Sequence, residues 1–124
     1  MAAITNSGLN KSLIHMRTLL THVGISTDQS VFNVNDTDLS PNVGATDLIQ
    51  TATVLNVSNA VDDYTMAVNS ANFGGNTIYT IGAMNNSTSA DNVSRSVRTN
   101  GLGVEAAGDE FIIGFRLTVS DQSP

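Results

Sequence analysis

The segment from Glu110 to Val119, EFIIGFRLTV, constrains the fold of this chain more than any other feature. Apolar side chains recur in it at every second position: Phe111, Ile113, Phe115, Leu117 and Val119. Because successive side chains of a strand point to opposite faces, this alternation predicts a half-buried β-strand. Ile112 is the one large apolar residue on the other face, so we expect it to point outward.

Other β-type segments precede this strand. Thr53 to Val57 alternates weakly, Tyr64 to Val68 alternates clearly, and Thr77 to Met84 contains a central glycine. Val93 to Arg98 also alternates, and the Asn100-Gly101 pair after it predicts a tight turn followed by a hairpin. Turns at intervals of about ten residues favour a mainly β fold, an antiparallel β-sandwich or small barrel of six to seven strands.

One short N-terminal helix is expected before the strands. Apolar residues from Gly8 to Met16 follow a helical spacing, and Asn6 or Ser7 is the candidate N-cap. The segment from Leu19 to Ile25 fits either a strand or a continued helix. Its β-branched end and Gly24 favour the strand.

At 124 residues, the chain is expected to form a single domain. Residues 1–25 hold the helix and first strand, 26–47 a long loop rich in turn formers, 48–120 the β body, and 121–124 a frayed tail. Val31 and Phe32 form an apolar pair that we expect to pin the long loop to the body.

Uncharged polar residues dominate the surface that this composition predicts. The chain has 14 Asn, 13 Ser and 14 Thr, whereas only 13% of its residues are charged. Such side chains enter wet, hydrogen-bonded contacts without the desolvation cost of an ion. The composition therefore favours a subunit that touches neighbours.

Charge and hydropathy exclude several partners. The net charge is −6 with a single lysine, so the chain lacks the basic stripe that nucleic acid requires. This balance also fits adaptation to high salt. No apolar run is long enough to span a membrane, and the start, MAAITNSGLNKSLIHM, does not predict a secretory signal. The absence of cysteine excludes disulfides and thiolate metal sites.

Candidate catalytic and metal-binding groups are sparse. No serine stands in a Gly-x-Ser-x-Gly elbow, and two histidines give little material for a triad. His15 and His22 would share a face of one continuous helix but lack a third ligand. Asp36 and Asp38 alternate as in calcium loops, without the glycine and glutamate of an EF-hand. We expect no enzyme activity, no cofactor and no metal.

Two kinds of polar residue are candidate contacts. Arg95, Arg98 and Arg116 form either a solvated strand face or inter-subunit pairs with Asp62, Asp63 or Glu105. The loops 26–47 and 85–91 are candidates for glycan binding, with Phe32 or Tyr79 as the aromatic platform. The candidate interface residues are Phe32, Ile112, Arg95, Arg98, Arg116, Asn85 and Asn86.

Three segments carry a family resemblance. The start, ITNSGLN from Ile4, is similar to a "T-N-x-G" opening, and TIYTIGAM is similar to an "I-x-E-I-G-L-F" strand, with Thr80 at the usually acidic position. Gly108-Asp109 before the last strand is similar to a final "G-D" element. In this order they resemble a family of small structural domains of tailed viruses of bacteria and archaea, found in tail fibres, baseplates and related appendages.

The resemblance implies a virion structural role without catalysis. The expected partners are copies of the chain, often as a homotrimer or another homo-oligomer, and other virion proteins. The expected location is the virion, after assembly in the host cytoplasm. A capsid decoration or turret protein remains an alternative, as does a receptor- or glycan-binding module.

Overall fold

The fold consists of two antiparallel sheets and one N-terminal helix. A computed structural model of the chain describes residues 4–42, 44–104, 108 and 110–120. The elements in chain order are α1 (Asn6–Leu19), β1 (His22–Ser26), β2 (Asp47–Thr51), β3 (Thr53–Ser58), β4 (Val61–Asn69), α2 (Ser70–Phe73), β5 (Asn76–Met84), the 3-10 turn η1 (Ser89–Asp91), β6 (Asn92–Val104) and β7 (Glu110–Thr118).

The strands form a four-stranded sheet of order β2-β1-β5-β6 and a three-stranded sheet of order β3-β4-β7. All of the pairs are antiparallel. The prediction of a mainly β, antiparallel fold with seven strands and one N-terminal helix is therefore confirmed. The described strands do not close into a barrel, so the architecture is the sandwich rather than the barrel alternative.

The helix α1 is longer than the sequence predicted. Its N-cap is Thr5, whose Oγ1 accepts a hydrogen bond from the backbone N–H of Gly8 at 3.0 Å, and not Asn6 or Ser7. It runs to Leu19, and β1 begins only at His22. Leu13 is the buried residue of this helix. No helix among the described residues is long and apolar enough to cross a membrane.

The core lies between the two sheets. Alternating side chains of β1 and β4 enter it, including Val23, Ile25, Tyr64, Met66 and Val68. The ring of Tyr64 stacks on Phe115 of β7 with centroids 4.8 Å apart. In β7 the expected face holds, since Ile113 is buried and Ile112 on the other face is 68% exposed. The alternation of β7 thus reports its true orientation.

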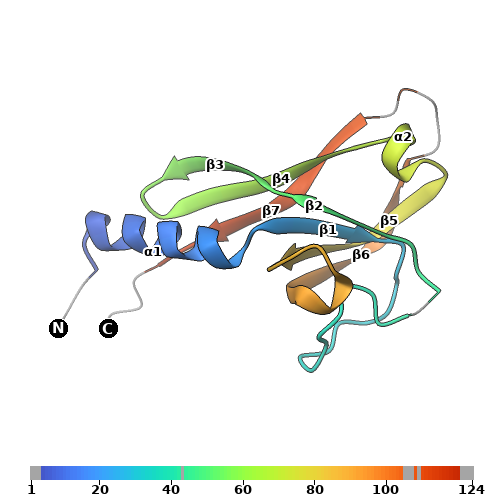
Figure 1. The fold of residues 1–124 in the computed structure, drawn as a ribbon, viewed down its shortest axis with the longest axis horizontal. Coiled ribbons are helices and arrows are strands. Elements are labelled where there is room, and N and C mark those ends of the chain that lie inside the picture. The colour runs from blue at the N-terminus through green and yellow to red at the C-terminus, as the bar shows by residue number, and fades with distance from the viewer. Residues whose placement is uncertain (1–3, 43, 105–107, 109, 121–124) are drawn as a thin grey trace.

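The chain crosses from one sheet to the other through the single residue Ala52, which separates β2 from β3. Figure 1 shows the resulting long green ribbon, with β3 and the start of β4 lying beside α1. Arg17 of α1 donates from Nε to Asp62 Oδ2 of β4 at 2.7 Å. The helix therefore packs against the three-stranded sheet at the end where β3 and β4 meet.

The hairpin predicted after Asn100-Gly101 is wrong. These residues lie inside β6, which pairs with β5 on both sides of them. Between Val97 and Leu102 the strand bulges, so that four residues face the single residue Tyr79. A methyl group on Gly101 would overlap the side chains of Thr77 and Tyr79, which explains the glycine by close packing rather than by a turn.

Candidate interaction surfaces

The long loop, residues 27–46 between β1 and β2, covers the outer face of the four-stranded sheet. Gly24 of β1 and Gly82 of β5 are direct cross-strand partners on that face. A methyl group on Gly24 would lie 2.6 Å from Leu39 Cδ2, and one on Gly82 would overlap Leu39 Cδ1. Leu39, fully buried, therefore occupies a slot that two glycines open. This anchor replaces the one expected at Val31 and Phe32, which was wrong.

Asp28 holds the start of the long loop from beneath. Its side chain is buried and accepts hydrogen bonds from the backbone N–H groups of Ser30 at 2.6 Å and Asn42 at 2.8 Å. Thr80 of β5 donates from its hydroxyl to the Asp28 carbonyl at 2.7 Å. Burial opposes ionisation of the carboxyl, but the hydrogen bonds outweigh it and hold the Asp28 pKa below its usual value.

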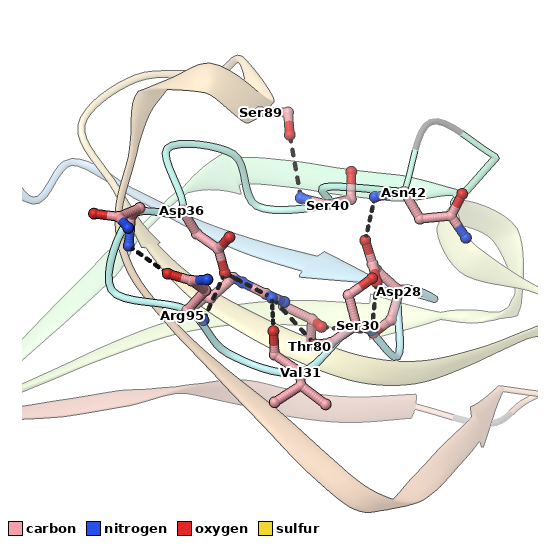
Figure 2. A network of polar contacts seen from close by, with 11 residues as sticks. Asp28, Ser30, Val31, Asp36, Ser40, Asn42, Thr80, Ser89 and Arg95 are labelled. Atoms are coloured by element: carbon pink, nitrogen blue, oxygen red, sulfur yellow. Dashed lines mark hydrogen bonds and ion pairs between the residues drawn. The ribbon is translucent and has the colours of Figure 1, made fainter.

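Arg95 of β6 organises the next part of the loop, as Figure 2 shows. Its guanidinium lies 2.9 Å from Asp36 Oδ2 and donates to the carbonyls of Ser30 and Val31, each at 3.1 Å. The Arg95 side chain is fully buried, so the expectation of a solvated or inter-subunit arginine is wrong here. Its role is internal, and it fixes the segment from Ser30 to Asp36.

That segment, which we call the loop tip (Ser30–Asp36), presents apolar side chains to solvent. Local hydrogen bonds shape it: Asp36 N–H donates to the Asn33 carbonyl at 2.9 Å, and Asn33 N–H donates to Asp36 Oδ2 at 3.0 Å. Val31 is 87% exposed and Phe32 52% exposed. The loop tip is therefore a hydrogen-bonded turn that carries the half-exposed ring of Phe32. Such exposure is what a contact residue requires.

The loop from Asn85 to Asp91 lies against the long loop. The Leu39 N–H donates to the Ser89 carbonyl at 2.9 Å, and the Ser40 N–H donates to Ser89 Oγ at 3.3 Å. Figure 2 shows Ser89 above Ser40 at this junction. Asn85 and Asn86 are both exposed, but the Asn85 side chain donates to the Leu19 carbonyl at 2.6 Å and is thereby fixed to the end of α1. The two loops proposed for glycan binding thus form one surface.

Arg116 pairs with Asp63 within the chain. Its Nε lies 2.7 Å from Asp63 Oδ1 across the β4–β7 pair, and this hydrogen bond holds the Asp63 pKa below its usual value. Arg98 donates from Nε to the Asn100 carbonyl in the β6 bulge. Since β6 and β7 belong to different sheets, the three arginines do not share one face. Glu105, a proposed partner, lies outside the described residues.

The histidines do not form the site that a continuous helix would have given them. His15 lies on α1, and His22 on β1 has Thr21 Oγ1 2.8 Å from its Nδ1. In the part of the chain that is described, no three histidine or acidic side chains gather as metal ligands do. A cavity of about 480 Å³ between the two sheets is lined mainly by apolar residues; its polar lining residues are Ser94, Arg95 and Ser96 of β6 and Arg116 of β7, and it includes neither histidine.

An exposed apolar strand is the surface that the sequence analysis missed. All six residues of β3 are exposed, and Val54, Leu55 and Val57 are large apolar residues among them. Leu55 is 64% exposed, close to the value for Ile112. The available signal was the absence of Lys, Pro and acidic residues from this strand, which are the groups that usually protect an edge.

Comparisons of the chain with protein-family models, with curated proteins and with solved structures find no match.

Proposed function

We propose that this chain is a non-enzymatic structural subunit of the virion of a tailed virus and that it assembles with copies of itself. The favoured location is a tail fibre, a baseplate or a tail-associated appendage, with a capsid decoration or turret as the alternative. Its partners are its own copies, as a homotrimer or another homo-oligomer, and other virion proteins.

One observation carries the self-assembly part of this proposal. The edge strand β3 exposes Val54, Leu55 and Val57 and bears no charge. Monomeric proteins protect such edges, and contiguous exposed apolar groups mark interaction sites. The viral part rests on the sequence resemblance at the chain start, in β5 and before β7.

The absence of catalysis is part of the same proposal. Acyl and phosphoryl transfer require a nucleophile beside a base or a preorganised set of charged groups. The ionised side chains with clear partners, Asp62, Asp63 and Arg95, are engaged in ion pairs within the fold. Arg95 lines the cavity between the sheets together with Arg116, but neither Asp62 nor Asp63 lines it, so no carboxylate among these ion pairs stands there as a base.

The direct test is quantification of the protein in purified particles of the virus that encodes it. The proposal predicts many copies per particle, retained after washes at high salt, and antibody labelling at one defined location. Labelling at the tail or at the capsid shell separates the two locations. Particles that lack the protein, while infected cells contain it in quantity, contradict a virion role.

A receptor- or glycan-binding module is the second candidate, favoured by the junction of the long loop with the loop 85–91. Phe32 on the loop tip and Asn86 on the loop 85–91 are both exposed, whereas the Asn85 side chain is bound to the Leu19 carbonyl. The informative variants are therefore Phe32→Ala and Asn86→Ala. Loss of cell attachment by particles that assemble normally supports the binding role, and unchanged attachment rejects it.

A further inference from the structure

Four strands lie at the edges of the two described sheets: β2, β6, β3 and β7. Three of them carry charges, with Asp47 on β2, Arg95 and Arg98 on β6, and Glu110 and Arg116 on β7. Charged side chains on an edge oppose its pairing with another chain. Only β3 among these edges lacks a charge, and it also lacks proline.

The outer edge of β3 has no described strand beside it. Its inner edge pairs with β4, from Thr53 opposite Thr65 to Asn56 opposite Asp62, and the register shifts between Asn56 and Ser58. The regularly paired part, Thr53–Asn56, therefore presents a row of main-chain donors and acceptors on its far side. Such a row is complementary to one kind of ligand, another extended strand.

A second copy supplies a matching strand, since its own β3 is exposed and uncharged, and charge does not oppose this pairing. Each copy has a net charge of −6, so two copies repel each other wherever acidic surfaces would meet. Between Asp47 and Asp62 the sequence has no ionisable side chain, and β3 lies in the middle of that interval. In an antiparallel β3–β3 pair, every residue of Thr53–Ser58 faces an uncharged residue in any register. A second copy therefore meets no like-charge penalty at this edge.

The helix α1 carries a further exposed apolar residue on the side nearer to β3. Arg17 bonds to Asp62 of β4, and Asn56 of β3 donates to the same carboxylate at 2.9 Å, which places this side of α1 under β4 and β3. Met16 lies on the other side of α1, where it lines a hollow with Leu117 of β7. At about 100° per residue, Ile14 lies about 60° from Arg17 and away from Met16, on the β3 side. Ile14 is therefore a further exposed apolar residue on this side of the helix.

We propose that β3 of one copy pairs antiparallel with β3 of a second copy about a two-fold axis, which joins two three-stranded sheets into one sheet of six strands. This inference rests on the proposed self-assembly and names the surface that mediates it. A two-fold contact gives a dimer by itself and a hexamer when it is combined with a three-fold contact elsewhere on the surface. The expected trimer and this dimer are therefore compatible as parts of one assembly.

Single cysteines test this pairing cleanly because the chain has none. Residues directly opposite in an antiparallel pair have Cα atoms about 4.5–5.5 Å apart, within the range of a disulfide. One of the series Thr53→Cys, Val54→Cys, Leu55→Cys and Asn56→Cys, the one nearest the axis, should give a covalent dimer in high yield under mild oxidation. Val31→Cys is the control, since Val31 is more exposed than Leu55 but lies on the loop tip.

The expected result is a dimer band on a non-reducing gel that peaks within β3 and is at least tenfold weaker for Val31→Cys. A second variant, Leu55→Lys, should reduce association of the otherwise unchanged protein at least tenfold, because it places two like charges beside the axis. Failure of all four β3 cysteines to cross-link above the control overturns the β3 pairing, as does a Leu55→Lys protein that associates like the parent.

The two proposals fail separately. A parent protein that is oligomeric and present in particles, without cross-linking at β3, overturns the inference and leaves the structural role standing. Absence from particles overturns the structural role, while the cross-linking result still decides the β3 pairing.

Discussion

Leu39 fills the space that a side chain at position 82 would occupy on the outer face of the four-stranded sheet. The effects of substituting these two residues should therefore depend on each other. Leu39 is fully buried, and its Cδ1 lies where a methyl group on Gly82 would be. Truncating a buried leucine to alanine costs about 3 kcal/mol, from lost burial and the cavity left behind. The opposite change, Gly82→Ala, adds a methyl group to a packed site and costs about 2 kcal/mol through overpacking.

The double variant Leu39→Ala with Gly82→Ala shows whether the two residues share one space or act independently on the free energy of unfolding. If the sites were independent, Leu39→Ala and Gly82→Ala together would cost about 5 kcal/mol. Because the new methyl group enters the volume that Leu39 vacates, we expect a total near 3 kcal/mol, a coupling of about 2 kcal/mol. The pair Leu39→Ala with Val68→Ala is the control, since Val68 lies in the core and should combine additively with Leu39.

Equilibrium unfolding in urea, followed by far-ultraviolet circular dichroism, measures each free energy of unfolding. The comparison is valid where the denaturant dependence is unchanged between variants. A coupling near zero between Leu39→Ala and Gly82→Ala would refute the slot. So would a cost below about 1 kcal/mol for Leu39→Ala, because a fully buried leucine cannot be lost so cheaply.

Three further predictions concern other contacts. Gly114→Ala should cost at least about 3 kcal/mol in urea unfolding, because its methyl group would overlap the Tyr64 carbonyl oxygen on the neighbouring strand; a cost under 1 kcal/mol would contradict that close approach. Arg95→Lys should raise amide hydrogen exchange in residues 30–36 more than in the core strands, since lysine cannot reproduce the planar fork; uniform exchange would argue against local anchoring. The Arg17 hydrogen bond lowers the Asp62 pKa, so this carboxylate stabilises the fold above its unfolded pKa near 3.8 and the gain is lost as pH falls through the folded value. Acid titration of unfolding should therefore show Asp62→Asn less stable than the parent at pH 7, with the difference shrinking as pH falls below 3.8 and through the folded pKa of Asp62; an equal difference at all pH values would exclude this linkage.

The sequence predicted the strands whose one face is buried. β7 and β4 alternate because the core requires every second side chain, and this requirement is visible in the order of residues alone. Local turn chemistry predicted less well. Asn100-Gly101 is a strong turn signal, but β6 continues pairing with β5 through a bulge, and close packing of Gly101 on Tyr79 sets its position. Contacts made by distant strands override such local preferences.

The same reason limited the prediction of the interaction surfaces. The anchor of the long loop is Leu39 because Gly24 and Gly82, far from it in sequence, become neighbours only when β1 pairs with β5. Arg95 lies on a strand that the sequence predicts to be solvated, and the sequence does not show that the long loop covers it. Ile112 was predicted to face outward from its strand period, and its 68% exposure confirms that orientation. β3 was missed because exposure on both faces of an edge strand depends on sheet order.

The proposal that this chain assembles with its own copies is tested most directly by sedimentation velocity of the untagged protein over a wide concentration range. The account predicts a defined species whose mass is a whole-number multiple of 13.0 kDa, and its conversion toward smaller species by Leu55→Lys. A single 13.0 kDa species up to millimolar concentration would contradict self-assembly.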